Sequence, residues 1–165
     1  MKLPIIINEA GKIYIEAVPQ LAWGKAKECT FIGALEAALA VTDTPHTYEN
    51  LMGWSALAFR TRWYHGANDR RWCPSCPVGE SAEELDLLRG AIGWELPTLS
   101  DFGSPTHPRE ELATTIVREI REGRPVLTYE PQLNVAVVFG FEDEGHILLA
   151  RDYMTDAPVA RLPLE

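Results

Sequence analysis

A chain of 165 residues is long enough for one domain with a sizeable core, and 46% apolar with 24% charged residues is ordinary for a globular protein. The net charge of −9 argues against a general nucleic-acid binder, which needs basic residues to neutralise phosphates. No apolar run approaches the roughly 20 residues of a membrane span or follows basic residues like a signal peptide. We therefore expect a cytoplasmic protein with neither nucleic acid nor membrane as a partner.

The three cysteines are odd in number, which argues against a full disulfide framework and suits reduced thiols in the cytosol. Two of them, Cys73 and Cys76, form a C-x-x-C pair. Such a pair can be a redox pair or half of a zinc site, although no second pair follows and no βαβ pattern flanks it. These alternatives and a plain structural loop stay open, and we predict no metal and no cofactor.

The first part of the chain predicts a β-hairpin followed by helices. Two β-rich runs, 5–7 and 13–18, flank a turn at 8–11. From Cys29 onward the apolar residues fall on one helical face and charges are few, which predicts a central, buried helix. A second helix is expected from near Thr47.

Two more helices are expected in the middle of the chain. Ser81 and Glu84 form a capping box before a helix from about 82 to 94. Pro108 fits the first position of the next helix, which Gly123 ends.

The C-terminal third predicts an antiparallel sheet. Strands at 125–129, 135–141 and 147–153 are short and apolar, and a turn at 142–145 joins the last two. The residues 159–165 either form a short final strand or lead into a further domain of a longer protein. The order of elements predicts an α+β fold, with an N-terminal helical half packed on a C-terminal antiparallel β-sheet and a cleft between them.

Cys29 is the first candidate for chemistry because it opens the predicted central helix. A thiol at a helix N-terminus lies at the positive end of the helix dipole, which stabilises the nucleophilic thiolate. Lys25 and Lys27 lie just upstream and can add to this effect. The alternative is that Cys29 is a small buried apolar residue at the start of a core helix.

The C-terminal third resembles the papain-like cysteine peptidase superfamily, most closely the bacterial branch that includes bacteriocin-processing peptidases. The resemblance rests on Gly123-Arg124-Pro125 between a helix and a strand, on the apolar run 135–141 before Glu142-Asp143, and on the strand that ends in Asp152. It implies a single papain-like domain over residues 1–165.

The N-terminal half is similar to the N-terminal domain of the butirosin-biosynthesis protein H family of thiol acyltransferases. The matching features are Cys29 at a helix start and the run Leu51-Met52-Gly53-Trp54-Ser55. Together the two resemblances cover roughly residues 25–60 and 110–155.

Carried over by position, the resemblance implies that Cys29 is the nucleophile and Asp152 the acid that orients the base. A hairpin turning at 142–145 brings residue 134 opposite about 153, so Asn134 and Asp152 should be neighbours. Asp152 can alternatively be a turn residue at a strand end.

This chain departs from the family at Asn134, where the family has a His. An amide takes up no proton at neutral pH, so the base that activates the thiol is missing, which costs about 10²–10⁴-fold in rate. Ordinary peptidase activity is therefore not expected. For the four histidines of the chain, structural or solvated roles are favoured over catalysis; they are His46, His65, His107 and His146.

Three residues are assigned to substrate binding. Trp23 stands six residues before Cys29, where papain-like peptidases place a Gln that donates to the oxyanion. Arg62 and Trp63 lie in an aromatic and basic segment that can pair with an anionic ligand and stack on it. The alternative is a loop whose arginines pair with the acidic C-terminal half.

Three functions follow from these residues. The first is thiol-dependent acyl transfer or amide hydrolysis on a small-molecule or peptide acyl substrate, with an atypical triad of Cys29, Asn134 and Asp152. A thioester substrate, which needs little base, would tolerate Asn134. The second is a catalytically degenerate papain-like domain that binds a peptide or acyl ligand. The third is a purely structural or interaction domain.

Overall fold

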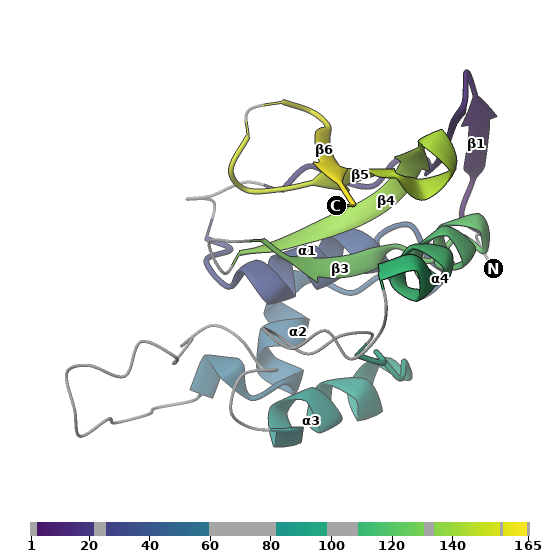
Figure 1. Ribbon diagram of the computed structural model, residues 1–165. Coiled ribbons are helices and arrows are strands. Elements are labelled where there is room, and N and C mark those ends of the chain that lie inside the picture. The colour runs from purple at the N-terminus through teal and green to yellow at the C-terminus, as the bar shows by residue number, and fades with distance from the viewer. Residues whose placement is uncertain are drawn as a thin grey trace.

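The computed structural model describes residues 3–21, 26–59, 82–98, 109–130, 134–155 and 157–164. Over these residues the chain forms four α-helices and six strands, and each strand pairing is antiparallel. Figure 1 shows α1 lying along the sheet beneath β3 and β4, with α2 and α3 farther from it. The predicted α+β class is confirmed.

The N-terminal hairpin pairs β1 (Ile6–Glu9) with β2 (Lys12–Ile15) in the register that joins Glu9 to Lys12. Ala10 and Gly11 form the two-residue turn between them, with φ of 49° and 78°. Two positive φ values in a two-residue loop are the geometry of a type I′ turn, whose twist matches that of paired strands. The predicted hairpin is therefore present, with its turn at Ala10 and Gly11 and with a second strand that ends at Ile15, before the expected residue 18.

Strand β4 (Val135–Glu142) is the centre of the sheet. It pairs with β5 (Ile147–Arg151), which in turn pairs with β6 (Ala160–Pro163). Along its length β4 also pairs first with β3 (Val126–Tyr129) and then with β2.

The N-terminal hairpin thus belongs to the same sheet as the C-terminal strands, which corrects the expected division into a helical half and a β half. Tyr14 of β2 pairs directly with Gly140 of β4. A Cβ at Gly140 would lie 2.8 Å from the Ile13 carbonyl oxygen, so a glycine is needed where the hairpin joins the sheet.

Helix α1 (Thr30–Leu39) is the central helix that the sequence predicts. All of its residues except Glu36 are buried, and it packs against β4, β3 and α2. Small fully buried residues of the sheet, such as Ala136 and Ala150, allow close packing in the core. These contacts fix the position of α1, and with it the position of Cys29 at its N-terminus.

The remaining helices surround this core. Helix α2 (Tyr48–Trp54) begins at Thr47, whose hydroxyl accepts a hydrogen bond from the Asn50 N–H as an N-cap. Helix α3 (Ala82–Ile92) is two residues shorter than expected. Helix α4 (Arg109–Arg121) ends where predicted, since Gly123 follows it with a φ of 79°.

The connection between β4 and β5 differs from a simple hairpin. A short 3₁₀ turn (Asp143–Gly145) joins the strands, and the pairing register shifts between Val138 and Gly140. Strand β5 ends at Arg151, two residues before the predicted end. The turn and the register shift decide which residues of β4 and β5 lie opposite each other at the end away from the turn.

Candidate thiol site

Cys29 is the N-cap of α1, with φ −81° and ψ 103°, and only 4% of the residue is exposed. Its carbonyl oxygen accepts the first helical hydrogen bond, from the Gly33 N–H at 2.9 Å. The thiol is therefore carried at the positive end of a buried helix, which favours the thiolate form.

The backbone of Cys29 is fixed by a residue of α2. Its N–H donates to the Tyr48 hydroxyl at 2.9 Å. The Tyr48 N–H donates to Glu36 Oε1 at 3.1 Å, and Lys27 Nζ donates to Glu36 Oε2 at 2.5 Å. The positive charge of Lys27, expected to act on the thiol, is thus paired with a carboxylate of α1. Lys25 lies outside the described residues.

Tyr153 lies against the first turn of the same helix. A Cβ built on Gly33 would lie 2.1 Å from the Tyr153 hydroxyl oxygen, so that hydroxyl takes the place of a side chain at position 33. Burial raises the pKa of Tyr153 well above its usual range, and the negative charge of a Cys29 thiolate adds to the rise. The pKa of Tyr48 is also raised, mainly by burial. Both phenols stay protonated at neutral pH.

Asp152 and Asn134 lie at the adjoining end of the sheet. Asp152 is buried, and its Oδ1 accepts hydrogen bonds from the Met154 N–H, the Thr155 N–H and the Thr155 hydroxyl at 2.9–3.1 Å. Asn134 donates through Nδ2 to the Met154 sulfur at 3.0 Å. The expected neighbours are therefore joined through Met154, and Asp152 has the role of a strand-end turn residue.

Glu130 is a carboxyl group at this end that the sequence did not bring to notice. Its N–H donates to the Asn134 carbonyl oxygen at 2.8 Å, so the two residues face each other across the β3–β4 pair. Its side chain is buried, and its Oε2 has no hydrogen-bond partner among the residues that the structure describes. Burial raises the pKa of Glu130, and the negative charge of Asp152 raises it further.

The other predicted site residues cannot be placed beside Cys29. Trp23, Arg62 and Trp63 lie outside the described residues, as do Cys73 and Cys76. In the described parts of the chain, no group of three or more His, Cys, Asp or Glu side chains is arranged to hold a metal ion. Those parts also contain no helix that is both long and apolar enough to cross a bilayer.

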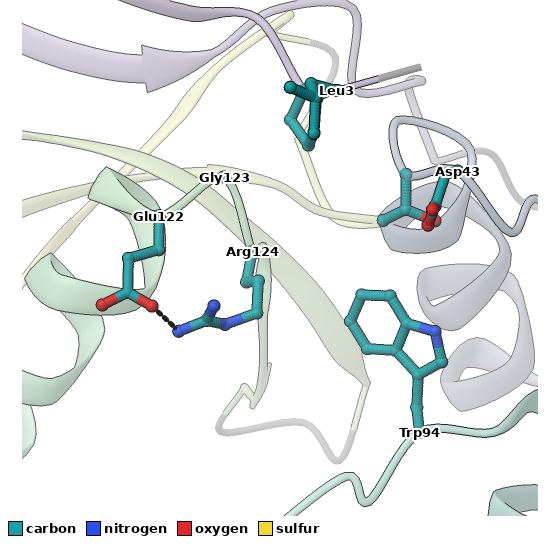
Figure 2. A pocket seen from close by; sticks show the side chains of 8 residues that line it. Leu3, Asp43, Trp94, Glu122, Gly123 and Arg124 are labelled. Atoms are coloured by element: carbon teal, nitrogen blue, oxygen red, sulfur yellow. Dashed lines mark hydrogen bonds and ion pairs between the residues drawn. The ribbon is translucent and has the colours of Figure 1, made fainter. Parts of the chain in front are cut away.

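A separate pocket of about 130 Å³ is lined in part by Thr42 and Asp43, which follow the C-terminal end of α1 (Figure 2). The Trp94 ring faces it from one side, and Arg124, which is paired with Glu122 and Glu119, faces it from the other. Trp94 donates through Nε1 to the Thr44 hydroxyl at 3.0 Å. None of the predicted site residues lines this pocket.

Sequence reasoning missed Tyr48, Tyr153 and Glu130. Each looks like an ordinary member of a helix or strand, and only the tertiary packing brings it to the thiol or to Asp152. The sequence carried one signal, the position of Glu130 directly after the short apolar strand 126–129, where polar side chains are placed at a sheet end.

No family model, no curated protein and no solved structure matches this chain. The resemblance to papain-like peptidases therefore stays a prediction that rests on the residues quoted above.

Proposed function

We propose that this chain is a papain-like domain that carries out thiol-dependent acyl transfer or amide hydrolysis, with Cys29 as the nucleophile and no His as its base. The observation that carries the proposal is the setting of Cys29, which caps a buried helix and has its backbone held by Tyr48. The turn after Asp152 lies against the same helix, through Tyr153 and Gly33. We place this activity in the cytoplasm, where thiols stay reduced.

The chemistry follows from a thiol whose ionisation does not depend on a His at position 134. The Cys29 thiolate would attack the carbonyl carbon of a small-molecule or peptide acyl substrate, forming a carbon–sulfur bond as the bond to the leaving group breaks. The acyl group would then pass to an amine or to water, which returns the thiol. A thioester suits this site because its leaving group departs as a thiolate and needs no proton from a general acid.

The test is the rate at which iodoacetamide alkylates Cys29 between pH 5 and 10, followed by mass spectrometry of the peptide that contains it. A thiolate that persists well below the ordinary thiol pKa of about 8.5 is expected. A Cys29 that reacts only after denaturant unfolds the chain would contradict the proposal. Because the readout is one peptide, alkylation of Cys73 and Cys76 does not disturb it.

A catalytically degenerate binding domain is the second candidate, and two observations favour it. Cys29 is almost fully buried, and the Asn134 amide is engaged with the Met154 sulfur. In that case the site would hold a peptide or acyl ligand without turnover. Binding of an acyl ligand that is unchanged by Cys29→Ser, together with an unreactive thiol, would favour this candidate.

A further inference from the structure

Resting on the proposed function, we propose that the Tyr153 hydroxyl is the hydrogen-bond donor that holds Cys29 as a thiolate, in place of the cationic His that the chain lacks at Asn134. In enzymes with a His beside the nucleophilic Cys, the imidazolium stabilises the thiolate. Here a neutral phenol would do so from the end of β5. The thiol proton would leave to solvent, and Tyr153 would keep its own.

The geometry places the hydroxyl on the Cys29 side of the helix. Gly33 lies one helical turn after Cys29, as its hydrogen bond to the Cys29 carbonyl shows. The Tyr153 hydroxyl oxygen lies 2.1 Å from the position that a Cβ at Gly33 would take. Because Cα–Cβ bonds in an α-helix tilt toward the N-terminus, this position lies between Gly33 and the helix start. The glycine is what lets the phenol approach.

The turn after β5 fixes the phenol in this place. Asp152 Oδ1 accepts three hydrogen bonds, from the backbone of Met154 and from the backbone and hydroxyl of Thr155. Tyr153 lies inside this turn and is buried. Asp152 is therefore a positioning residue in the proposal, since it holds the turn that carries Tyr153 instead of orienting a His.

The charges around the pair agree with a neutral donor. Burial raises the pKa of the Tyr153 phenol most, and negative charges on Cys29, Tyr48, Glu36 and Glu28 raise it further. A phenol that cannot ionise at neutral pH keeps its proton available for a hydrogen bond. Hydrogen bonds to a charged partner are the stronger kind, and they favour the charged form.

Tyr48 is the competing donor, and the two tyrosines make different contacts. The Tyr48 hydroxyl accepts a hydrogen bond from the Cys29 backbone N–H, so its loss leaves a buried backbone donor without a partner. Tyr153→Phe instead removes a hydroxyl from the space over Gly33. The first change should act mainly on stability and the second on the ionisation of the thiol.

The experiment compares the pH dependence of Cys29 alkylation in the wild-type chain and in Tyr153→Phe, with Tyr14→Phe as the matched control. The Tyr14 hydroxyl donates to Glu9 in the N-terminal hairpin, which pairs with the C-terminal part of β4, whereas Arg151, two residues before Tyr153, pairs with Val137. Circular dichroism melting of each variant checks the fold, and thiolate absorbance near 240 nm gives a second titration that does not depend on the reagent.

In Tyr153→Phe the thiol titration should move up by about one to two pH units, which lowers labelling below both midpoints about 10- to 100-fold. Tyr14→Phe should leave it in place. An unchanged titration in a folded Tyr153→Phe would overturn the role of Tyr153 while leaving Cys29 as a nucleophile. A wild-type thiol with an ordinary titration, or one that is unreactive in the folded chain, would overturn this inference and the proposed function together.

Discussion

The side-chain amide of Asn134 donates to the sulfur of Met154 at 3.0 Å, at the position where the papain-like resemblance expects the general base. An amide cannot accept the thiol proton, whereas an imidazole can. Asn134→His should therefore create esterase activity toward p-nitrophenyl acetate, at least about tenfold above the wild type, as part of the 10²–10⁴-fold effect of such a base. Steady-state hydrolysis rates across pH 5–9 measure it.

The matched control for this gain is the double variant Asn134→His with Cys29→Ser. Any hydrolysis that the imidazole alone supports would remain in the double variant, while hydrolysis through the thiol would disappear. If Asn134→His gives no more activity than the wild type, and its fold is intact, the start of β4 does not face the thiol as a papain-like site requires.

Glu130 provides a prediction about pH. Burial and the charge of Asp152 raise the pKa of this carboxyl in the folded chain above its value in the unfolded chain. The folded state therefore binds the proton more tightly, and its stabilising effect is complete below the unfolded pKa and lost as pH rises through the folded pKa. Glu130→Gln removes the charge, so it should increase the free energy of unfolding at neutral pH and change it little near pH 4.

Urea unfolding at several pH values tests this prediction, with Glu49→Gln as a control of opposite sign. Glu49 lies at the N-terminus of α2, where hydrogen bonds to its own backbone N–H and to Thr47 lower its pKa. Its replacement should therefore destabilise the chain slightly at neutral pH. A stabilisation by Glu130→Gln that is the same at pH 4 and pH 7 would show that the carboxyl has no raised pKa.

The sequence predicted the helices and strands that form this site better than it predicted which of their residues lie next to each other. Periodicity was enough for the helix after Cys29, because nearly all of its residues are buried in the core. The register at the far end of β4 and β5 was expected to bring residue 134 opposite about 153; in the structure Val137 pairs with Arg151, and Asn134 contacts Met154. The connection through the short 3₁₀ turn pairs Glu142 with Ile147, which by itself would put Asn134 opposite residue 155, and the shift between Val138 and Gly140 brings it back to 154.

The partners of Cys29 were not predictable for a different reason. Tyr48 and Tyr153 lie 19 and 124 residues after Cys29, and both look like apolar residues of a helix and a strand. Their hydroxyl groups gain a role only when α1, α2 and the end of β5 pack together. The turn at Asp152, by contrast, could be expected as an alternative from the sequence, because a carboxylate after an apolar strand is typical of a turn.

Tyr48→Phe should lower stability without creating or removing a titrating group near neutral pH. The change leaves the buried Cys29 N–H without its acceptor, which costs about 1–3 kcal/mol of unfolding free energy. Tyr14→Phe removes an exposed hydroxyl bonded to Glu9 and should cost less than about 0.5 kcal/mol. Equal effects of the two substitutions in urea unfolding would mean that the Cys29 N–H finds another partner.

Gly33→Ala has two opposing effects on stability, a gain in helix propensity and a steric clash with Tyr153. Alanine gains about 1 kcal/mol over glycine in a helix interior, yet its Cβ would lie 2.1 Å from the Tyr153 hydroxyl oxygen. Because the Tyr153 ring is buried, the hydroxyl cannot move aside without displacing the ring, and such overpacking costs about 1–3 kcal/mol. We expect a net loss of stability and, since the hydroxyl is pushed from the helix start, a thiol that titrates at higher pH.

Gly90→Ala is the matched control because Gly90 lies in α3 and no atom of the described residues lies within 4 Å of the position of its missing Cβ. It should raise the free energy of unfolding by about 0.5–1 kcal/mol and leave the alkylation of Cys29 unchanged. A Gly33→Ala variant that is stabilised to the same degree, with the thiol titration of the wild type, would show that Tyr153 does not press on the first turn of α1. The proposed hydrogen bond from the Tyr153 phenol to the Cys29 thiolate would then be contradicted as well.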